Sequence, residues 1–143
     1  MLTRRIRLLA FAPVVTVLAC QEPPDITPDL NEYETLVNNA NASACECFAE
    51  LGYTTPSECE ADLPEVSITG RQCMDDALAG HEEAGKDFLD CANMALQFYV
   101  QCLDANVDCD PAAYDTCSSD YMATLSSCPA LPADAESAFN ACQ

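Results

Sequence analysis

The sequence predicts a small all-α bundle of about four to six helices held together by five disulfides. Apolar residues recur at steps of three and four along most of the 143-residue chain, which is typical of amphipathic helices. Proline and glycine stand at the ends of these periodic stretches, where they start and stop helices. Eleven cysteines indicate that covalent bridges support a small core.

The chain begins with the pattern of an export signal. A basic start with three arginines precedes the apolar run Leu8–Leu18, which is too short to span a bilayer as a helix. Ala19 and Cys20 complete a sequence that resembles the lipobox of bacterial lipoproteins, although Leu18 stands where that family prefers a smaller residue. The resemblance implies that Cys20 carries fatty acids such as palmitate and that residues 1–19 are removed. Ordinary secretory cleavage after Ala19 is the alternative.

Cysteine parity agrees with acylation of Cys20. The ten other cysteines can all pair, whereas eleven would leave an odd thiol. Parity leaves the connectivity open, because ten cysteines allow roughly 945 pairings. The ten are Cys45, Cys47, Cys59, Cys73, Cys91, Cys102, Cys109, Cys117, Cys128 and Cys142.

The segment from Gln21 to Pro28 contains three prolines and is predicted to be an extended spacer. At about 3.1 Å per residue it would hold the domain roughly 25 Å from the membrane. We therefore divide the chain into a signal peptide (1–19), a lipidated cysteine with a proline-rich spacer (20–28) and a cysteine-rich acidic helical domain (29–143).

The domain is strongly acidic. All 24 acidic residues follow the signal, but only Arg71 and Lys86 of the five basic residues do, so the mature chain has a formal charge of −22. Nucleic acid is therefore excluded as a partner, because phosphate binding needs lysine and arginine. An anionic membrane surface would also repel this body. The simplest role of the charge is to keep the protein soluble. The same charge is compatible with binding of cationic ligands, of divalent metals or of a protein partner with a basic surface.

The first helix is predicted to start at Thr27-Pro28, where a capping hydroxyl precedes proline, and to stop at Gly52. Three asparagines in its middle favour a kink or a break there. Cys45 and Cys47 lie about 200° apart around the axis and should reach different partners. The inward face is predicted to be Leu30, Tyr33, Val37, Ala40, Ala44, Phe48 and Leu51.

Two helices are predicted next. Thr55-Pro56 starts a short helix that Pro64 closes, and a further helix runs from residues 65–67 to residue 79 before a stop at Gly80. The inward residues of this second helix are predicted to be Ile68, Cys73, Ala77 and Leu78.

The longest periodic stretch is predicted to be a central helix over residues 82–106. Cys91 and Cys102 are eleven residues apart, close to the roughly 10.8 residues of three turns, so both thiols leave the same side. The predicted face contains Ala84, Phe88, Cys91, Ala92, Ala95, Tyr99, Cys102 and Leu103, widened by Leu89, Leu96 and Phe98.

The last two helices are predicted at 111–127, starting at Asp110-Pro111, and at 133–141, with Phe139 inward. Cys117 and Cys128 are again eleven residues apart. Two consecutive helices with this spacing resemble twin-cysteine helical hairpins, in which antiparallel helices are bridged at both ends. This architectural resemblance implies the pairs Cys91–Cys128 and Cys102–Cys117. It also requires Cys109 and Cys142 to pair with cysteines of the N-terminal half.

The turn after the central helix is the candidate metal site. Oxygen-bearing side chains alternate there, and a last one falls at the twelfth position, so the turn resembles a calcium loop of the EF-hand type. It departs from that family at Cys109, where glycine is usual, at Pro111, and in ending on Asp. The alternative is a solvated acidic turn in which Asp110 caps the next helix. The candidate ligands are Asp104, Asn106, Asp108, Asp110 and Asp115.

No catalytic constellation is evident in the sequence. His81 is the single histidine, and without a second one the common zinc and general-base sites lack parts. Cys45 and Cys47 are better explained by structural bridges than by a redox pair. We therefore expect no enzyme and no cofactor, with calcium as the one candidate. Three methionines could line a small apolar pocket or fill the core: Met74, Met94 and Met122.

These observations predict a non-catalytic lipoprotein of the bacterial cell envelope that acts as an interaction or structural module. Gln21 stands where Gram-negative lipoproteins retained in the inner membrane often have aspartate, which favours the outer membrane by the same resemblance. One alternative is a small-ligand or calcium-binding module. Another is a secreted cysteine-rich effector or inhibitor.

Overall fold

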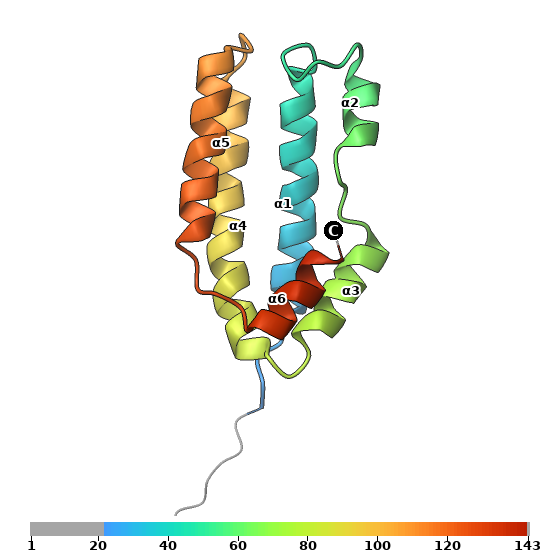
Figure 1. Cartoon of the computed structure of the whole chain (residues 1–143), viewed down its shortest axis with the longest axis vertical. Coiled ribbons are helices and arrows are strands. Elements are labelled where there is room, and N and C mark those ends of the chain that lie inside the picture. The colour runs from blue at the N-terminus through green and yellow to red at the C-terminus, as the bar shows by residue number, and fades with distance from the viewer. Residues whose placement is uncertain (1–21, 143) are drawn as a thin grey trace, which may run out of the picture.

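A computed structural model describes residues 22–142 and confirms the predicted all-α class (Figure 1). The predictions for the export signal, Cys20 and the start of the spacer lie outside the described residues. Between residues 22 and 142, no helix combines the length and the hydropathy needed to span a bilayer. The helices are α1 (Thr27–Glu46), α2 (Pro56–Asp62), α3 (Ile68–Leu78), α4 (Glu82–Ala105), α5 (Pro111–Ser126) and α6 (Ala133–Asn140).

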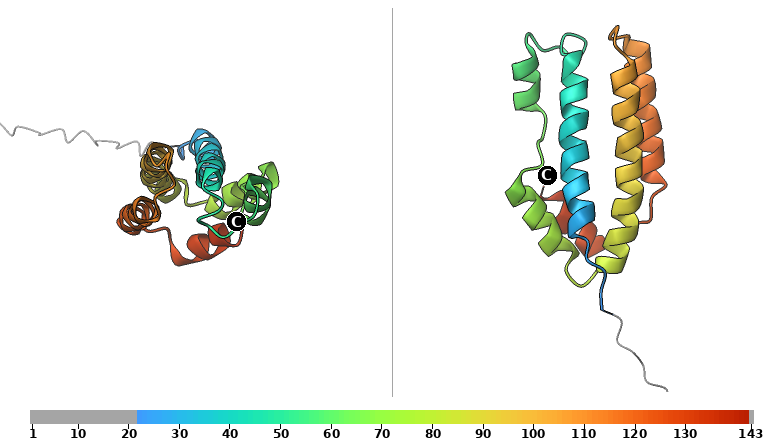
Figure 2. Two further views of the ribbon diagram at one scale, coloured as in Figure 1. Left: turned by 90° about the horizontal axis from the view of Figure 1, so that it is seen from above. Right: turned by 180° about the vertical axis from the view of Figure 1, so that it is seen from behind.

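Helices α1 and α4 lie side by side and run in the same direction (Figure 1). Polar contacts between them advance along both helices together, from Lys86 with Asp29 (3.3 Å), through Gln97 with Glu32 (2.7 Å), to Ser43 with Asp104 (2.7 Å). Because the two helices are parallel, the chain between them has to return to the end where α1 began. The view from behind shows α2, the segment that follows it and α3 making this return beside α1 (Figure 2).

The main core lies at the end of the bundle that α6 closes (Figure 1). Phe139 of α6 is 1% exposed, and its ring meets the edges or faces of Tyr33 and Phe88 with centroids 5.7 Å away in both cases. Such edge-to-face arrangements are favoured by the ring quadrupoles. The buried cluster is Ile26, Leu30, Tyr33, Val66, Met74, Leu78, Leu89, Ala92, Leu96, Leu131, Ala135 and Phe139.

Five disulfides staple the helices together, with Cα atoms 5.3–5.7 Å apart. The two pairs implied by the twin-cysteine resemblance form between α4 and α5, which run antiparallel. The other three pairs connect the N-terminal half to itself, to the α4–α5 turn and to the C-terminal end. Cys109 and Cys142 therefore pair with cysteines of the N-terminal half, as the resemblance required. The pairs are Cys45–Cys59, Cys47–Cys109, Cys73–Cys142, Cys91–Cys128 and Cys102–Cys117.

Most predicted helix starts are confirmed. The Thr55 hydroxyl accepts the Glu58 N–H (3.2 Å), and the Asp110 carboxylate accepts the Ala112 N–H (3.1 Å), as helix caps do. The predicted cap at Thr27 is wrong, because this residue already lies in the first turn of α1. Its N–H donates to the carboxylate of Asp25 instead (3.0 Å).

The predicted break in α1 is also wrong, because the helix is uninterrupted from Thr27 to Glu46. Two of the three asparagines, Asn38 and Asn41, pair with the segment between α2 and α3 instead of competing for the helix backbone. Asn38 donates to the Val66 carbonyl and accepts the Val66 N–H, both at 3.0 Å. Asn41 donates to the Pro64 carbonyl (2.9 Å). The asparagine amides therefore fix this segment against α1.

Several predicted inward residues are placed differently. Phe48 and Leu51 follow the end of α1 and lie in turns. Ile68 and Phe98 are each 62% exposed. Ile68 is the first residue of α3, which turns Met74 and Leu78, one helical turn apart, into the core. Phe98 lies on the outer side of the α4–α5 pair, in a shallow depression that also contains Thr124 and Asp120.

Candidate functional site

A groove lies near the middle of the bundle, beside the main core, with which it shares Tyr33, Val66 and Leu96. Residues of α1 and α4 line its floor, and residues of α5 and of the segment 64–66 line its two sides. Its volume is about 150 Å³. We call it the tyrosine groove, lined by Tyr33, Val37, Ala40, Asn41, Pro64, Glu65, Val66, Leu96, Tyr99 and Tyr121.

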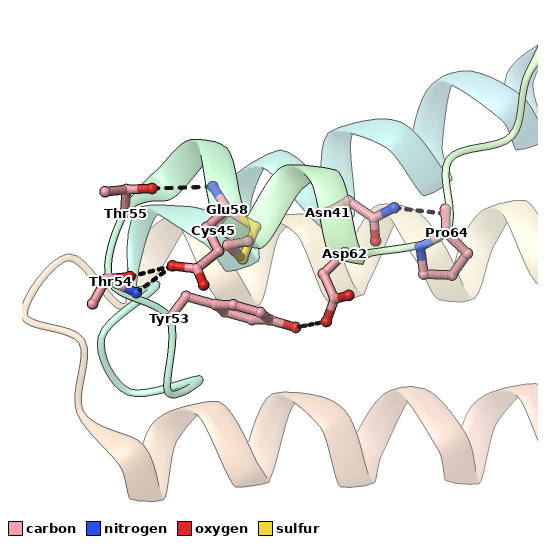
Figure 3. The surroundings of a disulfide bond; sticks show 9 residues. Asn41, Cys45, Tyr53, Thr54, Thr55, Glu58, Asp62 and Pro64 are labelled. Carbon is pink, nitrogen blue, oxygen red and sulfur yellow. Dashed lines mark hydrogen bonds between the residues drawn. A yellow bond between two sulfur atoms is a disulfide. The ribbon is translucent and has the colours of Figure 1, made fainter.

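Three of the five tyrosines of the chain, Tyr33, Tyr99 and Tyr121, line this groove. Tyr114 packs with Tyr99 against the second, smaller hydrophobic cluster, built on Ala44, Leu103 and Cys117. Tyr53 lies on the α2 side, where its hydroxyl donates to Asp62 (2.8 Å; Figure 3). Aromatic rings from α1, α4 and α5 therefore meet at this groove.

Tyr99 of α4 and Tyr121 of α5 form a stacked pair. Their ring centroids are 4.9 Å apart and the rings are inclined by 20°. The hydroxyls of Tyr99 and Ser118 lie 3.5 Å apart. The disulfides on either side of this pair, Cys91–Cys128 and Cys102–Cys117, fix the register of the two helices. The position of the stacked rings is therefore set covalently.

Helix α2, which precedes the segment 64–66, is held by a disulfide and by hydrogen bonds (Figure 3). The disulfide Cys45–Cys59 ties α2 to the end of α1. The Glu58 carboxylate accepts from both the N–H and the hydroxyl of Thr54, which shapes the turn before α2. Together with the Asn41–Pro64 bond, these contacts hold Glu65 at the rim of the groove.

The environment raises the pKa of three tyrosines. Burial, followed by the neighbouring Tyr99 hydroxyl, raises the pKa of Tyr114 to about 12. Burial is also the main cause of the raised pKa of Tyr121. For the exposed Tyr53, the hydrogen bond to Asp62 raises the pKa. Tyr53, Tyr114 and Tyr121 therefore keep their hydroxyl protons throughout the neutral pH range.

We expect alkaline titration to detect Tyr114 as the last tyrosine to ionise. Its pKa is about 12 in the folded protein against an ordinary value of 10, so its neutral form stabilises the fold fully below pH 10. This contribution is lost as the pH rises from 10 to 12. Tyrosinate absorbance should show a component near pH 12 that Tyr114→Phe removes, and the melting temperature of this variant should fall less over that range. Persistence of the component in Tyr114→Phe would show that another tyrosine produces it.

The basic side chains of the described domain are already paired. Arg71 forms an ion pair with Glu34 (3.0 Å) and a hydrogen bond with Asn31. Lys86 lies between two aspartates, at 3.3 Å from Asp29 and 3.1 Å from Asp90. In contrast, no hydrogen bond or ion pair within residues 22–142 engages the Glu65 carboxylate at the groove. The net negative charge therefore remains available to an external cation.

The candidate calcium ligands lie in the turn between α4 and α5, where two of them hold the backbone. Asn106 accepts the Asp110 N–H (2.9 Å) and donates to the Asp110 carbonyl (3.0 Å), while Asp110 caps α5. Asp104 accepts from Ser43, whereas Asp108 and Asp115 are exposed. Among the described residues, no three His, Cys, Asp or Glu side chains converge as a metal site would require.

Cys109 provides the geometry that the calcium-loop resemblance assigns to glycine. Its φ of 54° lies in the left-handed region, where residues other than glycine are uncommon. Its disulfide to Cys47 joins this turn to the end of α1. The turn is therefore a cross-linked junction, and calcium binding stays a prediction from sequence.

The remaining sequence candidates are dispersed. Cys45 and Cys47 enter different disulfides, as their positions around the helix predicted. His81 lies 3.6 Å from the Asp134 carboxylate, between the start of α4 and α6. Met74 is fully buried, but Met94 and Met122 are 57% and 60% exposed, so the three methionines do not line one pocket.

Comparisons of this chain with protein-family models, with curated protein sequences and with solved structures found no match.

Proposed function

We propose that this protein is a non-catalytic interaction module of the bacterial cell envelope, anchored by a lipid on Cys20, with the outer membrane as the favoured location. Its acidic body would bind a protein partner with a basic surface. The observation that carries the proposal is the pairing of Arg71 and Lys86 within the domain, which leaves the large acidic excess unneutralised. Opposite charges speed encounter and select partners by complementarity.

The direction of the chain supports this arrangement. The described chain starts at Glu22 and leaves the bundle at the end where α6 lies (Figure 1). A lipid on Cys20 would hold this end toward the membrane. The disulfide-bridged turns at the other end, 47–55 and 106–110, would then point away from it, and the tyrosine groove would open to the side.

The anchor is tested by the intact mass of the protein from the membrane fraction under non-reducing conditions. We expect added acyl mass on a chain that starts at Cys20, together with the loss of ten hydrogens that five disulfides require. Cys20→Ser should move the protein to the soluble fraction. An unacylated wild-type chain in the soluble fraction would instead support the secreted effector.

The interaction is tested by cross-linking in envelopes held at low or at high salt, followed by isolation of the cross-linked protein. A partner with a basic surface should be retained at about 0.05 M salt and lost at about 0.5 M, because screening shortens the range of exposed charges. Charge reversal on the basic patch of the cross-linked partner should abolish retention. Retention that is equal at both salt concentrations would contradict the proposed electrostatic association.

A further inference from the structure

We infer that the tyrosine groove is the docking site for a basic, extended segment of the partner, which inserts an arginine side chain between α5 and the segment 64–66. This inference rests on the proposed function and specifies where and how the acidic body recognises its partner.

The size of the groove favours a single side chain. Its volume is about 150 Å³, whereas small-molecule sites usually enclose roughly 300–1,000 Å³. A free small ligand of ordinary size would therefore remain largely exposed. One long side chain, delivered by a partner that also covers the rim, fits the available volume.

The lining favours a planar cation. Tyr99 and Tyr121 are stacked on each other at the groove, and Tyr33 belongs to the same lining. An arginine guanidinium stacks on aromatic rings, is attracted by their negative faces and is less strongly hydrated than a lysine ammonium. The raised pKa of Tyr121 keeps its ring neutral at physiological pH.

The charge at the rim agrees with the same occupant. The Glu65 carboxylate lines the groove, and no side chain of the described domain pairs with it. A carboxylate can accept two parallel hydrogen bonds from a guanidinium. Arg71 and Lys86, the two basic side chains of the described domain, are paired elsewhere, so the complementary charge has to come from another molecule.

An extended segment is favoured by a second depression beside the first. It has a volume of about 220 Å³ and shares Asn41 and Glu65 with the tyrosine groove. It continues past Asn38 and Ala42 to Glu60, so a further carboxylate follows Glu65 along the surface. Two neighbouring depressions that share Glu65 match consecutive basic residues of one extended chain.

The test uses the oxidised protein purified from membranes and a blocked, fluorescent glycine-serine peptide that carries two arginines. A matched peptide carries citrulline, which is nearly the same shape but neutral. We expect fluorescence polarisation to show binding of the arginine peptide and at least about tenfold weaker binding of the citrulline peptide.

Two pairs of variants locate the site. Tyr121→Leu should weaken binding about tenfold, whereas Tyr121→Phe, which keeps the ring, should bind like wild type. Glu65→Gln should weaken binding about fivefold, whereas Glu83→Gln, which removes an exposed charge from the first turn of α4, should change it by less than about twofold. Since Glu65 is exposed, its variant tests the site even where Tyr121→Leu fails to fold.

The outcomes separate this inference from the proposed function. Arginine-peptide binding that is unchanged in Glu65→Gln and Tyr121→Leu would overturn the groove assignment and leave an acidic partner-binding surface elsewhere. Equal binding of the arginine and citrulline peptides would overturn the recognition of a cation in the groove. In either case, salt-sensitive cross-linking in envelopes would still decide the proposed function by itself.

Discussion

Reduction of all five disulfides is expected to unfold this protein at about 37 °C. Each bridge in a small domain contributes about 2–4 kcal/mol, and the total stability of such domains is about 5–15 kcal/mol. The main core occupies only the end near α6, while the cluster at the other end has Ala44, Leu103 and Cys117 as its buried members. Little apolar burial would remain there to replace the lost covalent ties.

The measurement is far-ultraviolet circular dichroism during heating, after reduction and alkylation of the thiols. The control is unreduced protein exposed to the same alkylating reagent. We expect the control to melt cooperatively and the reduced protein to show no cooperative transition. A cooperative transition of similar midpoint in both samples would show that helix packing alone maintains the fold.

The loss of stability on removing a single disulfide should depend on the length of the chain segment that the disulfide closes. Cys47–Cys109 spans 62 residues and joins α1 to the α4–α5 turn, so replacing both with serine should lower the free energy of unfolding by about 4 kcal/mol. Cys102–Cys117 spans 15 residues, and its removal should cost about 3 kcal/mol. Urea unfolding of the two double variants measures this difference.

The helices were predictable from the sequence because their signals are local. Thr55 and Asp110 cap helices by accepting nearby backbone N–H groups, and Gly80 ends a helix with a positive φ. The structure confirms all three. The Cys91–Cys128 and Cys102–Cys117 pairs were implied by the resemblance to twin-cysteine hairpins, which depends on a cysteine spacing of three helical turns. Both kinds of signal depend on residues within one helix or one hairpin.

Predictions failed where a distant segment decides the environment. Asn38 and Asn41 weaken a helix considered alone, but in the fold their amides pair with the backbone at Pro64 and Val66. Ile68 and Phe98 have the periodicity of inward residues, yet no helix covers the sides on which they lie. Apolar periodicity in the sequence shows that a residue lies on the apolar face of a helix. It does not show whether another segment packs on that face.

The tyrosine groove was missed for a similar reason, although one signal for it was present. Tyr99 lies eight residues after Cys91, and Tyr121 lies seven before Cys128, so the twin-cysteine pairing already places the two rings at the same level. The opposite wall could not be predicted. It depends on the return path of segment 64–66, which the asparagines of α1 fix across the bundle.

Phe139→Ala should lower the free energy of unfolding by about 3–5 kcal/mol, which is typical of a buried phenylalanine truncated in a core. The ring is 1% exposed and contacts both Tyr33 and Phe88, so the variant leaves a cavity where α6 closes the bundle. The Cys73–Cys142 disulfide keeps α6 tethered to α3. The helix therefore cannot move away, and the cavity remains. Urea unfolding of the oxidised variant measures the loss.

Phe98→Ala is the matched control, because it removes the same ring from a position that is 62% exposed. Its free energy of unfolding should change by no more than about 0.5 kcal/mol. The sequence pattern placed both rings inward and would assign both a large loss, whereas the structure assigns a large loss to Phe139 alone. A large loss in Phe98→Ala would therefore contradict the packing of α4 and α5 described above. Equal small losses would show that α6 does not seal the core.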